Sequence, residues 1–193
     1  MAWITFQPKD NFSCNLYTGT GSEKTVTGVG FQADMNWIKR RNANSTNHQY
    51  FDSVRGATKH YYPDIAVATD TTAETLKSWN ADGYVLGTSG AVNTNGGTYV
   101  SWNWKCGTTS GLSGGTITPS SYSINATTGV GIYQYTGTGS AGTIAHGLGV
   151  APKLVIIKRS DASSQWSVYH YEVGEPKHLA LDTKIAEQTG SAY

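Results

Sequence analysis

The sequence predicts an all-β protein, an antiparallel β-sandwich, and three observations carry the prediction. Glycine makes up 23 of the 193 residues, aromatic residues 11% and charged residues only 14%, a composition typical of short strands and turns. About six to eight short runs, each with one apolar face, are separated by turn residues. No crossover helix is visible between them, so we expect two sheets packed face to face with a jelly-roll topology.

The chain also repeats itself. The letters YTGTGS of residues 17–22 return unchanged at residues 135–140, a period of 118 residues. Further matches follow after a one-residue gap: residues 28–31 with 147–150, 38–40 with 157–159, and 49–56 with 167–174. A period beyond the ~20–50 residues of solenoid repeats indicates a domain-sized unit. We expect a first β-sandwich domain at residues 1–107, a connection rich in Gly, Ser and Thr at 108–128, and a second, incomplete copy at 129–193.

In the first copy, alternation and apolar runs predict the strands. Residues 12–16 alternate, with Phe12, Cys14 and Leu16 predicted to face the core. The glycine-rich residues that follow end this strand in a turn. Further strands are expected at residues 25–27, 35–39, 50–54 and 83–87.

The clearest strand follows the turn NTNGG at residues 93–97, whose Asn-Gly pair is favoured in tight hairpins. In this strand, Val100, Trp102, Trp104 and Cys106 are predicted to face the core, opposite a more polar face.

One helix is considered, at residues 72–79. Thr71 and Glu74 have the spacing of a capping box. The counterpart around Ala186 and Glu187 lacks apolar periodicity, so an irregular loop is the alternative.

The second copy opens with Val130, Ile132 and Gln134, which have the spacing of residues 12–16. Its central strand is expected at residues 154–157, a short apolar run.

Charge and hydropathy exclude several classes of function. The formal net charge is +1 and the basic residues are scattered, so the sequence has no cluster of positive charge that would bind nucleic acid. No apolar run approaches the ~20 residues that cross a bilayer, and residues 1–6 lack the basic and apolar regions of an export signal. We therefore expect no nucleic-acid partner and no membrane insertion.

No catalytic or cofactor site is predicted either. The glycine-rich residues 19–25 depart from the spacing of a phosphate-binding loop. The five histidines have no partner at metal-ligand spacing, no carboxylate pair can be nominated, and no Gly-x-Ser-x-Gly elbow occurs. The sequence therefore predicts a protein without cofactor, bound metal or enzymatic activity.

Cys14 and Cys106 are both placed on the inward face of terminal strands, which leaves two interpretations. Adjacent edge strands could bring the sulfur atoms to disulfide distance, whereas buried free thiols behave as small hydrophobic groups. Because no export signal is present, free thiols are favoured.

Four residues outside the best strand patterns are the candidate ligand-binding residues: His60, Tyr61, Tyr62 and Trp79. Such side chains can stack on sugar rings while neighbouring Asn and Asp residues bind hydroxyl groups. The competing interpretation, an aromatic cluster that closes the end of the core, is the favoured one.

Several ordered motifs resemble a known domain. In the first copy they are YTGTG at residues 17–21, TGVGFQ at 27–32, WIK at 37–39, FDSVRG at 51–56, DGYVLG at 82–87 and TYVSWNWK at 98–105. In the second they are HGLGVAPK at 146–153 and WSVYH at 166–170. Over nearly its whole length the chain is similar to a domain found, often in tandem, in tail-fibre and other virion proteins of bacteriophages, notably marine and cyanobacterial ones.

This resemblance implies a concanavalin-like (laminin-G-like) sandwich with a structural or adhesive role and no catalytic or metal-binding residues. It implies a non-enzymatic component of a phage particle, foremost a tail fibre or appendage, assembled in the host cytoplasm and located in the virion. A carbohydrate-binding module that recognises a host surface glycan is the alternative, and a capsid decoration protein or a hydrolytic enzyme ranks third.

The implied partners are other virion proteins and further copies of the chain in a homo-oligomer, a trimer by analogy with fibres. Cys106 departs from the small residue expected in the family.

The second copy lacks counterparts of residues 84–86 and 100–104. A sandwich without those strands exposes apolar faces and an unpaired sheet edge. We therefore expect either that the polypeptide continues beyond Tyr193 or that another chain donates the missing strands.

Overall fold

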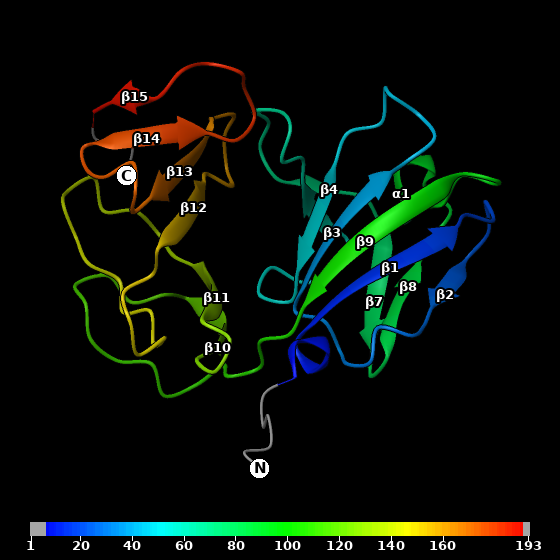
Figure 1. Cartoon of the computed structure of the whole chain (residues 1–193), viewed down its shortest axis with the longest axis horizontal. Coiled ribbons are helices and arrows are strands. Elements are labelled where there is room, and N and C mark those ends of the chain that lie inside the picture. The colour runs from blue at the N-terminus through cyan, green and yellow to red at the C-terminus, as the bar shows by residue number, and fades with distance from the viewer. Residues whose placement is uncertain (1–6, 191–193) are drawn as a thin grey trace, which may run out of the picture.

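The computed structural model of the chain describes residues 7–190, which form a nearly all-β structure (Figure 1). The helical elements within this range are one 3-10 turn, η1 (Pro8–Asp10), and one turn of α-helix, α1 (Gly90–Asn93). No helix among these residues is long and apolar enough to cross a membrane. The predicted all-β class is confirmed.

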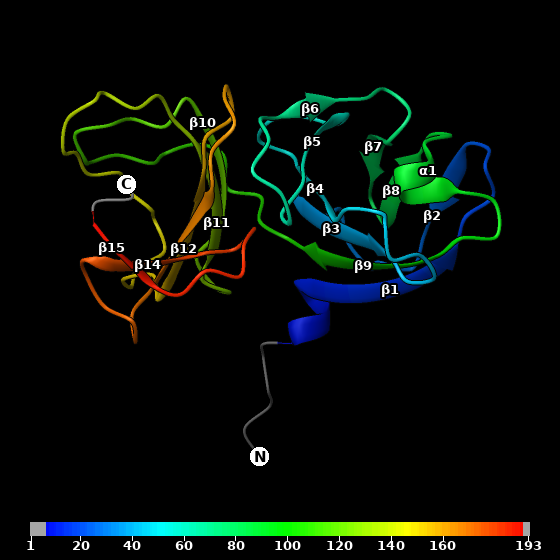
Figure 2. The same ribbon diagram turned by 90° about the horizontal axis from the view of Figure 1, so that it is seen from above.

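Residues 7–107, which we call the first unit, form a sandwich of two antiparallel sheets. The larger sheet has the order β1 (Phe12–Thr18), β9 (Thr98–Trp104), β3 (Met35–Arg40), β4 (Gln49–Asp52), β5 (Lys59–Tyr61) and β6 (Asp70–Thr71). The smaller sheet has the order β2 (Lys24–Val26), β8 (Gly83–Leu86) and β7 (Leu76–Asn80). In Figure 2 the larger sheet curls around the smaller one, so it has an inner face toward the core and an outer face away from it.

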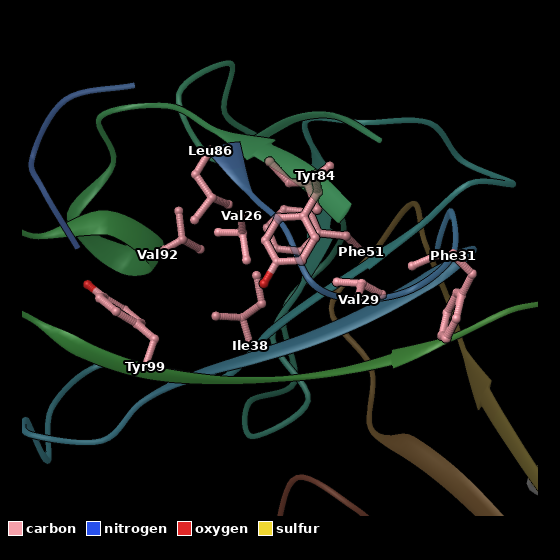
Figure 3. Packing of buried hydrophobic residues seen from close by; sticks show 11 residues of the cluster. Val26, Val29, Phe31, Ile38, Phe51, Tyr84, Leu86, Val92 and Tyr99 are labelled. Atoms are coloured by element: carbon pink, nitrogen blue, oxygen red, sulfur yellow. The ribbon is translucent and has the colours of Figure 1, made fainter. Parts of the chain in front are cut away.

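Apolar side chains from both sheets fill the space between them (Figure 3). Ile38, Phe51, Tyr84, Leu86 and Tyr99 are all 0% exposed. Complete burial of a large apolar side chain contributes about 1.5–3 kcal/mol relative to exposure. The first unit therefore has a closed hydrophobic core.

The prediction of which faces of β1 and β9 point toward the core is wrong. The side chains expected in the core are exposed on β1 and only partly buried on β9: Phe12, Cys14, Leu16, Val100, Trp102 and Trp104. The inner face of β9 consists of Tyr99, Ser101 and Asn103, which are each 0% exposed. Only Cys106, beyond the end of β9, is buried as expected.

The partly polar inner face is stable because its amide groups satisfy one another. Asn36 Nδ2 donates a hydrogen bond to Asn103 Oδ1 over 2.6 Å, and Trp79 Nε1 donates to Asn36 Oδ1 over 2.5 Å. Asn103 Nδ2 also donates to the carbonyl oxygen of Ser13. An unpaired buried amide would cost about 1–3 kcal/mol, and these hydrogen bonds remove that cost.

The helix considered at residues 72–79 is also wrong. Leu76–Asn80 is strand β7, which pairs with β8. The Glu74 carboxylate does not cap a helix, because it accepts hydrogen bonds of 3.1 Å from both the N–H group and the hydroxyl group of Thr88. The acidic residue that suggested a capping box therefore fixes a loop beside β8.

Residues 121–190, which we call the second unit, contain two further antiparallel sheets. One pairs β10 (Ser121–Asn125) with β11 (Val130–Gln134), and the other has the order β12 (Leu154–Lys158), β13 (Trp166–His170), β14 (Lys177–Ala180) and β15 (Gln188–Thr189). The four-stranded sheet has the same strand order as β3, β4, β5 and β6 of the first unit. The cross-strand pair Tyr50 and Tyr61, for example, recurs 118 residues later in each strand as Val168 and Leu179.

Local hydrogen bonds recur together with the strands. The Asp64 carboxylate accepts a hydrogen bond of 3.1 Å from the N–H group of His48. At the equivalent positions, Asp182 accepts one of 2.9 Å from the N–H group of Trp166. The sequence repeat is therefore also a structural repeat over this sheet.

Residues 108–128, predicted as a connection, contain strand β10 and pack against the first unit. The hydroxyl group of Ser123 on β10 donates a hydrogen bond of 2.9 Å to Asp34 Oδ1. Asp34 also accepts hydrogen bonds from the Ser53 hydroxyl (2.7 Å) and from the Cys106 N–H group (2.8 Å). One buried carboxylate thus ties the ends of β4 and β9 to β10.

The two cysteines are unbonded, as favoured from the sequence. Cys14 lies exposed on the outer face of β1, whereas Cys106 is buried. The expected inward orientation of Cys14 is therefore wrong, and the strand register keeps the thiols apart, because Cys14 lies opposite Trp102, four residues before Cys106.

Candidate functional site

The outer face of the larger sheet presents a continuous group of large apolar side chains. Phe12 (39% exposed) and Leu16 (64% exposed) lie on β1. Trp102 and Trp104 on β9 and Trp37 on β3 are partly buried beside them. We call these five residues the outer aromatic face.

Strand register places these side chains in rows across the sheet. Phe12 lies opposite Trp104, and their ring centroids are 5.0 Å apart. Trp102 lies opposite Trp37 on the next strand. Directly paired residues of antiparallel strands point to the same face, so the alternating sequence of β9 brings its two indole rings to one surface.

The face continues into the joint between the two units. Tyr50 and Tyr61 lie on the same side of β4 and β5, and the Trp166 ring of the second unit is 6.0 Å and 5.2 Å from theirs. Trp166 is 5% exposed, and its Nε1 donates a hydrogen bond of 3.0 Å to the carbonyl oxygen of Tyr62. The second unit therefore covers the end of the outer face over β4 and β5.

Arg55 completes this joint. Its guanidinium carbon lies 3.7 Å from the centroid of the Tyr61 ring and 5.7 Å from that of Tyr50. Its Nε is 2.7 Å from Asp52 Oδ2, and both side chains are almost fully buried. The cation is thus neutralised by a carboxylate and held by aromatic faces, an arrangement that fits a structural role.

The Trp37 end of the outer aromatic face is fixed by a histidine. Trp37 Nε1 donates a hydrogen bond of 2.8 Å to His48 Nδ1. Burial lowers the pKa of His48, Asp64 opposes this shift, and Lys39 adds to it. The imidazole is therefore neutral at pH 7 and carries its proton on Nε2.

The four residues predicted to bind sugar do not form one platform. His60 and Tyr61 are 1% and 6% exposed, and as neighbours in β5 they point to opposite faces of the sheet. Trp79 lies on β7 in the other sheet, where its indole N–H is bonded to Asn36. Tyr62 and Trp79 are both half-buried, and Trp79 packs against the core of the first unit.

His60, Tyr62 and Asp70 form a hydrogen-bonded chain. Tyr62 Oη donates to Asp70 Oδ2 over 2.8 Å, so its single proton is used and His60 Nε2, at 3.0 Å, is the donor to Oη. Burial lowers the pKa of His60, whereas burial and Asp70 raise the pKa of Tyr62 to about 12. Both groups are neutral at pH 7, and the chain joins β5 to β6.

A cavity of about 580 Å³ lies where β10 meets the first unit. Its lining includes Asp34, Ser53 and Cys106. Burial and, to a smaller extent, Asp34 raise the pKa of the Cys106 thiol to about 12, so the thiol is protonated at pH 7 and is a poor nucleophile. Between residues 7 and 190, no group of three His, Cys, Asp or Glu side chains could hold a metal ion.

The sequence patterns detected the outer aromatic face but assigned it to the core. Trp102 and Trp104 share one face of their strand, as predicted, and only the choice of the buried face is wrong. The pairing of Asn103 with Asn36, which satisfies both amides on the buried face, is visible only in the structure.

The model of one protein family, the domain of unknown function DUF7483, matches residues 7–193 and so spans both units. No curated protein and no solved structure matches the chain.

Proposed function

Since the chain belongs to the DUF7483 domain family, whose function is undefined, we propose from its surfaces and its sequence motifs that it is a non-catalytic structural component of a bacteriophage particle. The proposed place is a tail fibre or virion appendage with an adhesive role, and the proposed partners are other virion proteins and further copies of the chain. The resemblance of its ordered motifs to tail-fibre domains supports the virion location.

The observation that carries the adhesive role is the outer aromatic face. Trp37, Trp102 and Trp104 lie on adjacent strands of one rigid sheet and remain partly exposed. Aromatic side chains contribute large contact areas with little loss of conformational entropy. A rigid surface of this kind suits binding to another protein or to a saccharide.

Antibodies against the chain, applied to purified phage particles that carry its gene, test the location. We expect labelling of the tail or its appendages. Labelling of the head would favour a capsid decoration protein. A chain that is present in the lysate but absent from intact and dissociated particles would contradict a virion role.

Substitutions on the outer aromatic face test the adhesive role. The double change Trp102→Ser and Trp104→Ser should weaken binding of the labelled chain to host cells or to particle proteins by about tenfold or more, the loss of one or two hot-spot residues. The matched control is Val67→Ser, which removes an exposed apolar side chain (37% exposed) away from this face. Equal binding of both variants would contradict the assignment of the face.

A carbohydrate-binding module is the second candidate, and the side-by-side indoles of Trp37 and Trp102 favour it. A glycan array with the released sugar measured in parallel tests it. Binding that is lost in Trp102→Ala but kept in Tyr62→Phe would support glycan recognition by the outer face. Release of sugar by the chain would contradict the non-catalytic assignment.

A further inference from the structure

One side chain of the outer aromatic face is held by a group that takes up a proton at mildly acidic pH. Trp37 Nε1 donates a hydrogen bond of 2.8 Å to His48 Nδ1. The two rings meet edge to face at 85°, with their centroids 5.9 Å apart. An indole N–H group can only donate, so the imidazole must present an unprotonated Nδ1. This hydrogen bond therefore requires the neutral form of His48.

The other indole hydrogen bonds of the molecule end on acceptors that do not titrate. Trp79 Nε1 donates to the amide oxygen of Asn36, and Trp166 Nε1 donates to the carbonyl oxygen of Tyr62. Neither kind of oxygen takes up a proton between about pH 4 and pH 8. Among the indole hydrogen bonds of residues 7–190, that of Trp37 alone ends on a titratable acceptor.

The groups that face the imidazole determine where it takes up its proton. After β5, the Asp64 carboxylate accepts hydrogen bonds of 3.1 Å and 3.2 Å from the N–H group of the same histidine and favours the imidazolium. On β3, Lys39 disfavours it. On β4, burial keeps the pKa of Tyr50 well above its ordinary value, so this phenol stays neutral. On β9, the residues opposite are Val100 and Trp102, which do not titrate.

Burial is the largest of these influences, and it holds the pKa of His48 below its ordinary value of 6.5. Protonation below that value leaves two donors facing each other. Both nitrogens of an imidazolium carry a proton, so no flip of the ring restores an acceptor for Trp37. Asp64 holds the backbone of His48 and attracts the cation. Trp37, which is only partly buried, is therefore the side chain that moves.

The second unit lacks both members of this pair. The equivalent of Trp37 is Ile156 on β12, and the equivalent of His48 is Trp166 at the start of β13. An alkyl group and an indole ring cannot form the titratable hydrogen bond. The pair thus occurs in the unit that carries the outer aromatic face.

We propose that His48 is a positioning residue that makes the outer aromatic face sensitive to pH, because its neutral imidazole fixes Trp37 beside Trp102 and its imidazolium releases Trp37. The consequence for adhesion rests on the proposed function, in which this face binds a partner. A side chain that is already held in place loses less conformational freedom on binding. Binding is therefore strongest at neutral pH and weakens as the pH falls through the lowered pKa of the imidazole.

The indole N–H signals in NMR spectra of the isotope-labelled chain test this role without any partner. From about pH 8 to about pH 4.5, the Nε1 signal of Trp37 should shift together with the ring signals of His48, with a midpoint below 6.5. The signals of Trp79 and Trp166 should remain constant over the same range. The missing signal in a Trp37→Phe variant identifies that of Trp37.

Two substitutions distinguish an acceptor from a titratable acceptor. The amide oxygen of an asparagine occupies the place of Nδ1, so the Trp37 signal of His48→Asn should be independent of pH. His48→Leu has no acceptor and should show the acidic signal of Trp37 at every pH. A constant Trp37 signal in the parent chain, equal shifts of Trp37, Trp79 and Trp166, or a shift that persists in His48→Asn would overturn the proposal. The spectra of the parent chain decide the matter if a variant does not fold.

Binding of the labelled chain to host cells or to particle proteins gives the functional readout. Over the same pH range the affinity of the parent chain should fall about tenfold, the loss of one hot-spot residue, and the affinity of His48→Asn should stay constant. Binding that requires Trp102 and Trp104 but does not change with pH would overturn the role of His48 and keep the proposed function. Binding that does not require them would contradict the proposed function, and the indole titration would still decide whether His48 positions Trp37.

Discussion

The two units build the same four-stranded arrangement, but only the first closes a core over it. Ile38 of β3 is 0% exposed, whereas Ile157, its equivalent in β12, is half-buried and lines a cavity. The strand pairs and the hydrogen bonds of Asp64 and Asp182 are nevertheless preserved. Local sequence is therefore sufficient to set strand pairing and register, while burial depends on strands from distant parts of the chain.

The largest difference between the units is expected in the core. Ile38→Ala should lower the free energy of unfolding of the first unit by about 2–5 kcal/mol, because it leaves a cavity in a close-packed site. Ile157→Ala should cost less than about 1 kcal/mol, since little apolar surface is buried around it. Urea unfolding combined with hydrogen exchange in each unit measures both. Equal losses would mean that the second unit has a closed core in solution.

The repeated YTGTGS motif gives the next difference. A Cβ atom on Gly19 would overlap the carbonyl oxygen of Thr94, whereas one on Gly137 would have no atom within 4 Å. Gly19→Ala should therefore cost about 1–3 kcal/mol, and Gly137→Ala should change the stability by less than about 1 kcal/mol. Thermal unfolding of the two variants against the parent chain makes the comparison. A neutral Gly19→Ala would show that the turn can move away from α1.

The two equivalent aspartates, Asp64 and Asp182, should contribute equally to the stability of their units. Asp64→Ala and Asp182→Ala each leave a backbone N–H group without its charged acceptor, and each should cost about 1–2 kcal/mol. Local exchange rates at His48 and Trp166 report the losses, and the Asn variants, which keep an acceptor oxygen, serve as controls. A loss confined to Asp64→Ala would show that the repeat is preserved in register but not in stability.

The smallest expected difference between the units is the titration of Asp82 in the first unit. Asp82 accepts hydrogen bonds from the N–H groups of Gly28 (3.0 Å) and Gly30 (2.6 Å), and these bonds hold its pKa below the ordinary value of 3.8. A depressed carboxyl pKa means that the bonds are intact above pH 4 and are lost as the pH falls through the lowered value. The amide signals of Gly28 and Gly30 should shift in that range, and Asp82→Asn should abolish the shift.

The second unit offers the internal control for this titration. No carboxylate hydrogen bond to the equivalent glycines, Gly147 and Gly149, is present in the described range, so their amide signals should remain constant. A common shift of all four glycines would indicate general acid unfolding in place of the titration of one aspartate.

The strands could be predicted from the sequence because they depend on neighbouring residues. Alternation located the strand at residues 12–16, and the Asn-Gly turn located β9. The buried face of β9 could not be predicted from hydrophobicity, because Ser101 and Asn103 are stabilised inside by partners on β1 and β3 that are distant in sequence. The prediction of a helix from Glu74 was wrong for the same reason. The Glu74 carboxylate accepts a hydrogen bond from Thr88, a residue distant in sequence, and does not cap a helix.

The candidate site was less accessible to prediction than the fold. His60, Tyr61 and Tyr62 were grouped because they are adjacent in the sequence, but adjacency in a strand separates side chains onto opposite faces. The joint around Trp166 depends on the approach of two units, which no local pattern encodes. None of the four residues predicted to bind a ligand belongs to the outer aromatic face, and Trp102 and Trp104, which do, were predicted to lie in the core.

The attachment of β10 to the first unit has a mechanical consequence. Thr108 and Ile124 exchange two backbone hydrogen bonds of 2.9 Å, and the Gly107 N–H group donates to Ser123. Tension between the units is shared by these bonds, by the hydrogen bond from Ser123 to Asp34 and by the joint around Trp166, so residues 109–122 are loaded only after all of these contacts break. If they rupture, the loop can extend by about 45 Å at ~3.4 Å per residue before the backbone of either unit is loaded. We therefore expect a pulling force to open the joint before it removes any strand of the first unit from its sheet.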